Sequence, residues 1–470
     1  MIGHSLNQIF KMEVSFMRSK KNFKSNLLIF VILIAVLMSS LCACTEEKTN
    51  DITNKTTEYV EAQDYQFQYA AKDYFSSGNK INETDKGYYF IDDGFIYFMD
   101  KSNMEYTPLC NKPDCRHDKS ESCNAYLNSF SSDMNSNIFF NKGFIYYPAT
   151  SSKGGKSIMR ISADGGSKEK VTEINSDWVP IIIVHRGYLY YFESTYGNNS
   201  TDGLKSGEMI IAHSQIKRVD LSDSNFKSEV FIDNDVLGKG KINTVQNIRS
   251  AYGNNILIFY QSFNQKITDD GKGGLMREDM EYEEKNILVN TDTGKVTDIT
   301  FINEKNNERT ADICYLDGKL LINSSKKLSD DEHDFSDIYT MNFDGTDLKK
   351  VFTKPEKFKN AFLYSDEKNI YLCTTFPDTP NVLSFMVYDK NFQLLNTVDI
   401  DCGKYIYSED CVLVGAGDKM FFRSVDFVDT DNDGQPDSEV HLLRYIDKSE
   451  MLNSKTKLSM TTAYEKNIEV

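Results

Sequence analysis

The sequence predicts an all-β fold, a β-propeller of seven four-stranded blades, preceded by a signal peptide and a flexible tether. Strand-forming aromatic residues are abundant, with 30 Phe and 27 Tyr, whereas the chain has only 8 Pro. A short strand–turn–strand pattern recurs seven times, and a second turn follows each copy. Four strands per unit at a period near 50 residues are typical of propeller blades.

The first hairpin of each unit joins two aromatic or β-branched strands through Gly, Asn or Asp. These residues adopt the positive φ values that tight hairpins demand, and the alternation around each turn has the period of two of a β-strand. The seven copies are YYFIDDGFIYF (88–98), IFFNKGFIYY (138–147), IIVHRGYLYYF (182–192), SAYGNNILIFY (250–260), ICYLDGKLLI (313–322), FLYSDEKNIYLC (362–373) and VLVGAGDKMFF (412–422).

The second turn of each unit is marked by an aspartate. The spacing between successive marks averages about 58 residues, close to the length of one blade. A propeller also leaves only short strand edges exposed, because the blades repeat radially. The marking residues are Asp100, Asp164, Asp220, Asp292, Asp344, Asp389 and Asp447.

The alternative fold is another all-β form, such as two β-sandwiches, although sandwiches rarely repeat one double-hairpin unit seven times. We expect the propeller to occupy residues 85–470, after a lipidated cysteine and tether over 44–84. The first blade looks one strand short. We expect the missing strand to come from residues 61–75 or from the tail 458–470.

The start of the chain has the order of an export signal. Arg18, Lys20, Lys21 and Lys24 precede the uncharged apolar run 27–41, which is short for a membrane span. Leu41-Cys42-Ala43-Cys44 resembles the bacterial lipobox. The resemblance implies cleavage after residue 43 and acylation, including palmitate, of the Cys44 thiol and its new amino group. An uncleaved anchor is the alternative, and Met17 would give a more ordinary start.

The net charge of the chain limits the kinds of molecule that this protein can bind. The chain carries a net charge of −17, and the leader holds more basic than acidic residues, so the mature protein is more acidic still. Nucleic-acid binders need a basic surface, so nucleic acid is excluded as a partner. We expect a cell-membrane protein on the extracytoplasmic face, attached by its lipid anchor.

Three cysteines and a histidine lie within fourteen residues, at Cys110, Cys115, His117 and Cys123. Such ligands can close a tetrahedral zinc site, although the spacing departs from the usual pairs of cysteines two residues apart. Because export permits disulfides, a bridge from Cys110 or Cys115 to Cys123, or independent thiols, are the alternatives. Closing a loop of about 14 residues would stabilise the fold by roughly 3 kcal/mol. A second bridge is possible between Cys402 and Cys411.

An acidic segment near the C-terminus resembles the calcium loops of EF-hand and thrombospondin type 3 proteins. Alternating carboxylates with Gly434 at the sixth position can converge on Ca²⁺. The twelfth position is Val440, so the usual bidentate glutamate is absent, and the flanks look like strands. The alternative is a solvated acidic turn. The expected calcium ligands are Asp429, Asp431, Asp433, Gln435 and Asp437.

The phrase PLCNKPDCRHDKSESCNAY after GYYFIDDGFIYF resembles a signature of bacterial propeller lipoproteins. These come mostly from Gram-positive gut and soil bacteria, carry domains of unknown function, and have TolB-like or Kelch-like repeats. The resemblance spans lipobox, tether and repeats. It implies the fold and the location, and it implies no activity.

The long insertions fall between the second and third strands of a blade, at 194–209, 264–284 and 426–439. These connections open on one face of a propeller, and insertions mark the binding face of repeat folds. We therefore expect a binding or scaffold module for a protein, peptide or glycan. The alternative is an extracytoplasmic hydrolase or lyase with its active site at the propeller channel, although no catalytic motif is present. No organic cofactor is expected.

Overall fold

The computed structural model of the 470-residue chain describes the greater part of residues 81–469, all within one compact unit, 56–470. The predicted signal peptide 1–43 lies outside the described residues, as does the tether up to residue 80. Among the described residues, no helix has the length and apolar character needed to cross a membrane. The described ranges are 81–127, 138–151, 153–176, 181–196, 205, 207–210, 212–238, 241–272, 274–303, 308–329, 333–366, 368–403, 411–413, 417–428 and 437–469.

Strands make up most of the described chain and form seven antiparallel sheets, here called sheets 1 to 7 in chain order. Sheet 1 holds β1 (Ile81–Glu83), β2 (Gly87–Asp92), β3 (Phe95–Asp100) and β4 (Tyr106–Pro108). Sheet 2 holds β5 (Phe139–Asn141), β6 (Phe144–Thr150), β7 (Lys156–Ser162) and β8 (Lys168–Ile174). Sheet 3 holds β9 (Ile182–His185), β10 (Tyr188–Tyr196), β12 (Ala212–Asp220) and β13 (Ser228–Ile232).

The next two sheets carry short additional strands. Sheet 4 holds β14 (Ile242–Tyr252), β15 (Asn255–Asp269), β16 (Leu275–Asn290) and β17 (Val296–Asp298), and β11 (Met209–Ile210) joins it from the connection inside sheet 3. Sheet 5 holds β18 (Ile302–Asn303), β19 (Glu308–Leu316), β20 (Lys319–Lys327), β21 (His333–Asp334), β22 (Asp337–Met341) and β23 (Lys349–Thr353).

The last two sheets share the C-terminal segment. Sheet 6 holds β24 (Phe362–Ser365), β25 (Asn369–Phe376), β26 (Thr379–Asp389) and β27 (Leu394–Asp401), with β31 (Leu458–Ser459) added in parallel to β27. Sheet 7 holds β28 (Cys411–Leu413), β29 (Lys419–Val428), β30 (Ser438–Asp447) and β32 (Thr461–Glu469). The short helices are α4 (Asn234–Gly238), η1 (Glu356–Phe358) and α5 (Lys448–Asn453).

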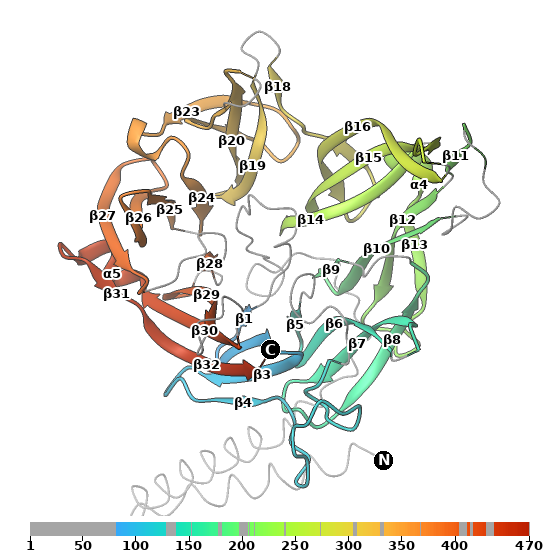
Figure 1. Ribbon diagram of the computed structural model, residues 1–470, viewed down its shortest axis with the longest axis horizontal. Coiled ribbons are helices and arrows are strands. Elements are labelled where there is room, and N and C mark those ends of the chain that lie inside the picture. The colour runs from blue at the N-terminus through green and yellow to red at the C-terminus, as the bar shows by residue number, and fades with distance from the viewer. Residues whose placement is uncertain are drawn as a thin grey trace, which may run out of the picture. The chain divides into compact units, whose positions relative to one another are not determined.

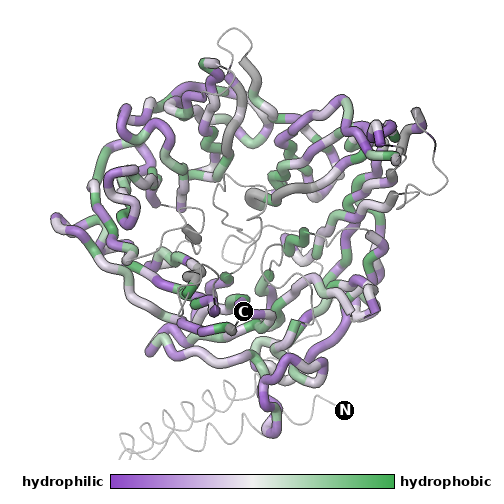
Figure 2. Tube along the Cα trace, viewed as in Figure 1, coloured by the Kyte–Doolittle hydropathy of each residue, from purple (hydrophilic) through white to green (hydrophobic). Residues whose placement is uncertain are grey.

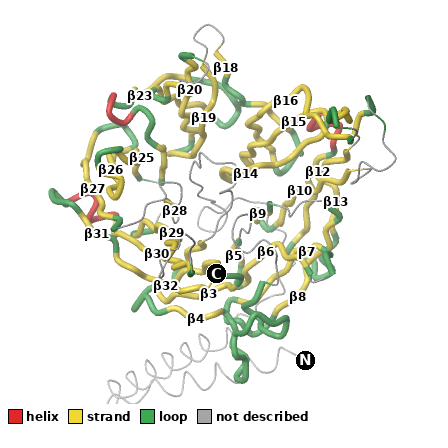
Figure 3. The backbone as a smooth tube through the Cα atoms, in the orientation of Figure 1, coloured by secondary structure: helices red, strands yellow, loops and turns green. Residues whose placement is uncertain are grey.

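The seven sheets stand around a ring, each with its first strands toward the centre and its last strands at the periphery (Figure 1). Innermost strands of neighbouring sheets contact one another in chain order, as β5, β9, β14, β19 and β24 do. Strands dominate this unit, and the few helical turns lie at its rim (Figure 3). The prediction of an all-β, seven-bladed propeller is confirmed.

Apolar side chains fill the spaces between neighbouring sheets. One cluster of buried residues spans sheets 2, 3 and 4, and further clusters lie between sheets 4 and 5, 5 and 6, and 6 and 7. The remaining cluster joins sheets 7, 1 and 2 and includes Tyr88, Phe421 and Tyr147. Inner strands such as β2 and β9 are buried along their whole length, whereas hydrophilic positions are prominent on the outer strands (Figure 2). This arrangement keeps the apolar surface between the sheets.

The hairpin turns have the chemistry that the sequence predicted. Four of them consist of a residue with φ between 44° and 50° followed by glycine with φ between 75° and 80°, the conformation of a type I′ turn. Five of the seven marking aspartates, all except Asp292 and Asp447, accept a hydrogen bond from the backbone N–H two residues on, as Asp100 Oδ1 does from Ser102. In the fourth unit Asn290 Oδ1 accepts this bond, from Asp292 N. The four turns are Asp93–Gly94, Lys142–Gly143, Arg186–Gly187 and Asp317–Gly318.

Sheet 1 corrects two expectations about the start of the propeller. Its hairpin at 88–98 joins the second and third strands, β2 and β3, whereas the corresponding hairpins of sheets 2, 3, 4, 6 and 7 join the first and second. The missing strand is β1, at Ile81–Glu83, and neither expected segment supplies it: residues 61–75 lie outside the described residues, and the tail forms β32 of sheet 7. The propeller therefore begins before residue 85, inside the range assigned to the tether.

The three long insertions lie between the second and third strands of sheets 3, 4 and 7, as expected. The insertion at 264–284 is not a loop, because β15 and β16 pair along most of it and form a two-stranded ribbon. Residues 197–204 and 429–436 of the other two insertions lie outside the described residues.

Candidate metal centre

The four candidate metal ligands lie on one loop between sheets 1 and 2, here called the cysteine loop (residues 109–127). Backbone hydrogen bonds hold both ends of the loop on the β2–β3 hairpin. Leu109 N donates to Ile96 O at 2.8 Å, Ile96 N donates to Ala125 O at 2.9 Å, and Leu127 N donates to Gly94 O at 2.8 Å. The loop is therefore closed at its base by the first sheet.

The other side of the cysteine loop rests on the turn between β7 and β8 of sheet 2. Asn124 Nδ2 donates to Gly165 O at 2.9 Å. Gly165 has φ +73°, and a Cβ built on it would lie 2.8 Å from Cys110 N and from Leu109 C. Only glycine permits this approach, because a real Cβ would overlap the backbone of the loop. The loop thus bridges two neighbouring sheets.

The side chains of Cys110, Cys115, His117 and Cys123 converge. Their four ligand atoms all lie within 4.8 Å of one another, and Cys123 Sγ lies 3.7 Å from His117 Nδ1. Tetrahedral zinc places thiolate sulfurs about 3.8 Å apart, so a small contraction would complete the coordination. His117 has the left-handed φ of 52°, which is uncommon outside glycine and often marks a functional constraint. These four residues can hold a metal ion.

Backbone N–H groups approach two of the sulfurs, and the pKa values of these two thiols are shifted in opposite directions. Burial raises the pKa of Cys110, but hydrogen bonds from the backbone N–H groups of Lys112 and Asn124 bring that pKa below its ordinary value. Burial and the neighbouring Cys115 raise the pKa of Cys123 to about 11, against hydrogen bonds from the backbone of Tyr126 and Ala125. Thiolates are the form that binds metal, and such N–H···S contacts favour them.

A lysine of sheet 2 supplies positive charge beside the cluster. Lys168 Nζ donates to Tyr126 O at 2.5 Å and lies 3.5 Å from Cys123 O. Burial lowers the pKa of Lys168, whereas the nearby thiols Cys123 and Cys110 raise it. Three thiolates, one imidazole and a divalent ion carry a net charge of −1, so an adjacent ammonium offsets it. No sequence pattern indicated Lys168, which reaches the loop only through the fold.

The three thiols of the cluster are unbridged in the structure. Cys402 is buried at the end of sheet 6, and the side chain of Cys411 lies outside the described residues, so their pairing stays a prediction. The calcium prediction also stays untested, because residues 429–436 lie outside the described residues and only Asp437 is described. The segment is flanked by strands β29 and β30, as expected, and not by helices.

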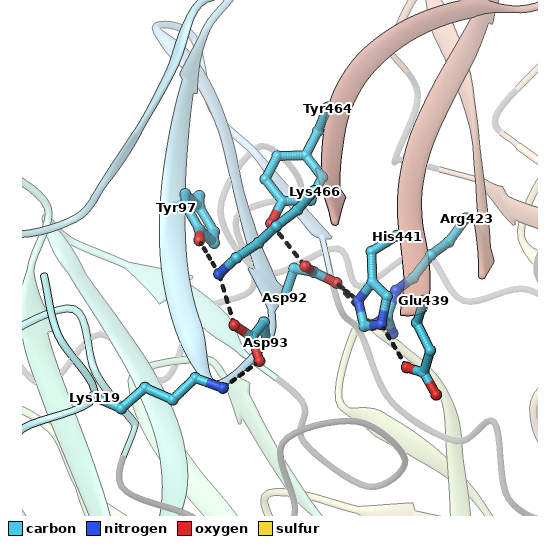
Figure 4. Close-up of polar contacts among 9 residues, drawn as sticks. All are labelled: Asp92, Asp93, Tyr97, Lys119, Arg423, Glu439, His441, Tyr464 and Lys466. Atoms are coloured by element: carbon cyan, nitrogen blue, oxygen red, sulfur yellow. Dashed lines mark hydrogen bonds and ion pairs between the residues drawn. The ribbon is translucent and has the colours of Figure 1, made fainter. Parts of the chain in front are cut away.

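A second cluster of charged side chains lies where sheet 7 meets sheet 1, here called the closure interface (Figure 4). Asp92 is 3% exposed, and its Oδ1 lies 2.7 Å from His441 Nδ1 and 3.0 Å from Arg423 Nη2. Tyr464 OH donates to Asp92 Oδ2 at 2.7 Å, and His441 Nε2 lies 3.2 Å from Glu439 Oε2. The hydrogen bond with Asp92 raises the pKa of His441.

The closure interface is not arranged as a catalytic site. His441 is 4% exposed, and both of its ring nitrogens face carboxylates, so neither is placed to take a proton from a substrate. Sequence reasoning missed Asp92, the partner of His441, because 349 residues separate the two.

No protein-family profile matches this chain, and no curated protein matches it. Solved structures similar to it include the oligogalacturonate lyase of Vibrio parahaemolyticus, at 11% identity and a TM-score of 0.42 over 76% of this chain and 88% of that one. A polysaccharide lyase bound to an ulvan fragment is 12% identical, with a TM-score of 0.39 over 86% and 96% of the two chains. An uncharacterised Listeria monocytogenes protein is 10% identical, with a TM-score of 0.38 over 70% and 80%. At these scores the similarities carry no argument about activity.

Proposed function

We propose that this protein is an exported, lipid-anchored β-propeller that binds zinc as a structural ion and docks a protein, peptide or glycan on one face. The observation that carries the zinc assignment is the convergence of Cys110, Cys115, His117 and Cys123 on one loop. Zinc suits three thiolates and an imidazole, and a closed set of four protein ligands is typical of structural rather than catalytic zinc. The leader and Cys44 support the anchor.

Metal analysis of the purified full chain in detergent tests the zinc assignment. We expect about one zinc per chain, and we expect a Cys110→Ser/Cys123→Ser double variant to lose it, since two of four ligands disappear. The matched control is Cys402→Ala, which alters a cysteine outside the cluster and should keep the metal. A zinc-free chain about two mass units lighter before reduction would instead indicate a disulfide in the cluster.

The β15–β16 ribbon supports the docking face. It extends beyond β17, which pairs with β16 only at residues 287–289. It also exposes large apolar side chains, with Tyr282 50% and Met276 49% exposed, amid acidic residues. Exposed apolar side chains gathered on an inserted element are typical of interaction sites. A partner with apolar and basic groups would match this ribbon.

Site-specific photo-crosslinking on intact cells tests the docking face. A crosslinker placed at Tyr282 should yield a discrete covalent adduct, because the ribbon would lie against the partner. The control position is Leu394, which is similarly exposed at 52% but lies on the outer strand β27 of sheet 6. Equal adducts at both positions, or none at Tyr282, would contradict docking on the ribbon.

A further inference from the structure

The β2–β3 hairpin connects the metal centre with the closure interface. Its turn, Asp93–Gly94, has positive φ at both residues, which fixes the direction in which Asp92 and Asp93 point. The cysteine loop holds this turn from one side. Lys119 of the loop forms an ion pair with Asp93 Oδ1 at 2.6 Å, beside the backbone bond from Leu127 to Gly94.

The last strand of the propeller holds the same turn from the other side. Lys466 of β32 forms an ion pair with Asp93 Oδ2 at 2.6 Å, so one carboxylate joins the cysteine loop to the C-terminal strand (Figure 4). Next to it, Asp92 receives hydrogen bonds from Tyr464 of the same strand and pairs with His441 of β30. Asp93 is partly buried at 13% exposure, which limits screening by solvent.

The contact between sheets 7 and 1 is made by side chains: these polar groups and the apolar cluster that joins the same sheets. Within the described residues, β32 completes sheet 7 and β4 completes sheet 1, and neither sheet borrows a strand from the other. Sheets 6 and 7 differ, because the chain leaves β30, adds β31 to sheet 6 and returns as β32. The closure interface is therefore held by side-chain contacts and not by a shared strand.

Metal binding would lower the free-energy cost of the contacts that hold the β2–β3 hairpin in position. The cysteine loop is mostly polar, and ordering such a segment costs conformational entropy. An ion bound by four side chains of the loop already restricts its conformational freedom. The contacts from the loop to Asp93, Gly94 and Ile96 then form at a smaller further cost in entropy. The same coupling acts in reverse, because two linked equilibria must affect each other equally.

We propose that zinc at the cysteine loop locks the propeller ring, with metal occupancy coupled through Asp93 to the contact between the first sheet and the last strand. This inference rests on the proposed zinc site. It assigns that site a regulatory role: metal loss loosens the closure interface, while the other sheet contacts stay as they are.

Hydrogen exchange and zinc titration of the full chain in detergent test the coupling. Zinc should slow amide exchange in β32 by about five-fold or more and leave β23 of sheet 5 unchanged. In return, Lys466→Met should weaken zinc binding by about five-fold, although Lys466 touches no proposed ligand. The matched control is Lys390→Met, which removes an ion pair with the hairpin residue Asp317, between sheets 5 and 6, and should leave zinc affinity unchanged.

The outcomes separate the two proposals. Zinc that binds at one ion per chain but leaves exchange in β32 unchanged, with Lys466→Met matching the wild type, would overturn the coupling and leave the zinc site standing. A chain that binds no zinc would overturn the site, and the lock with it. Slower exchange in β32 together with weaker binding by Lys466→Met supports both.

Discussion

At the scale of single residues, burial decides how much the charges of this protein matter. Several ion pairs of the described residues join well-exposed side chains, as Lys170–Glu173 and Lys390–Asp317 do, and such a pair contributes little because water and salt screen it. Asp92 and His441 differ, since both are nearly inaccessible and each has several polar partners. Removing one member of such a group leaves the other as a buried charge without its partner, which is strongly destabilising.

The stability supplied by His441 should depend on pH. Hydrogen bonding to Asp92 raises the pKa of His441, with Glu439 raising it further and Arg423 lowering it. A raised folded-state pKa means that the stabilisation is complete below about pH 6.5 and is lost as the pH rises through the raised value. Despite burial, contacts with His441 and Arg423 lower the pKa of Asp92, so its contribution is lost only in acid, below about pH 4.

Thermal unfolding of wild type and His441→Gln at pH 6 and pH 9 measures this dependence. The wild type should exceed the variant clearly at pH 6 and by less at pH 9, because a smaller fraction of His441 is protonated at the higher pH. His213→Gln is the control, since His213 is exposed and pairs only distantly with Asp233. A gap that widens between pH 6 and pH 9 would contradict the assignment of a charged His441.

At the scale of elements, turns carry much of the architecture. Two-residue turns with glycine set four of the hairpins, because their backbone twist matches the twist of the strands. Some glycines are needed only because their backbone has a positive φ. Gly165 is also needed because a side chain there would overlap the neighbouring backbone. Gly143 and Gly165 have similar φ angles, of +80° and +73°, but only Gly165 faces another backbone within 3 Å.

Alanine substitutions separate these two requirements. Gly143→Ala should cost about 1–2 kcal/mol of unfolding free energy, for the left-handed backbone alone. Gly165→Ala should cost about 1–3 kcal/mol more, because the new Cβ overlaps Cys110 and Leu109. Chemical denaturation gives both values. Gly165→Ala should also lower zinc content, and equal losses of stability would show that the close approach is not maintained in solution.

The elements that could be predicted from sequence are those with local signals. The turn at Asp93–Gly94 and the marking aspartates were found because their chemistry lies within a few residues. The identity of the strands joined by the first hairpin was not found, because β1 spans only Ile81–Glu83 and shows no periodicity. The cysteine cluster was found because all four ligands fall within fourteen residues.

At the scale of the whole molecule, the stability of the propeller and its proposed attachment to the membrane have separate physical causes. The ring buries its apolar surface between sheets, so it needs no membrane for stability. The proposed attachment depends on one residue, Cys44, whose acyl chains would hold the ring at the extracytoplasmic surface. One acyl chain binds membranes weakly and reversibly, whereas two or more anchor a protein stably.

Labelling with palmitate and membrane fractionation test the anchor. Cys44→Ala should lose the label and leave the membrane fraction, because the thiol that accepts the lipid is gone. Cys42→Ala is the matched control, two residues earlier in the same segment, and should keep both label and location. Unchanged detergent-dependent partitioning of Cys44→Ala would contradict the lipoprotein proposal.

The sequence by itself determined the all-β class, the number of repeating units, the turn positions and the grouping of the four candidate metal ligands. Each depends on residues close together in the chain, where the period of a strand or the φ of a turn leaves a local pattern. Only the tertiary structure decided that Ile81–Glu83 opens the first sheet, that Lys168 stands beside the thiols, and that Asp92 meets His441. Those contacts depend on how seven similar sheets close into a ring. Because the sheets resemble one another, no short-range sequence pattern identifies which residues will meet where the first sheet packs against the last.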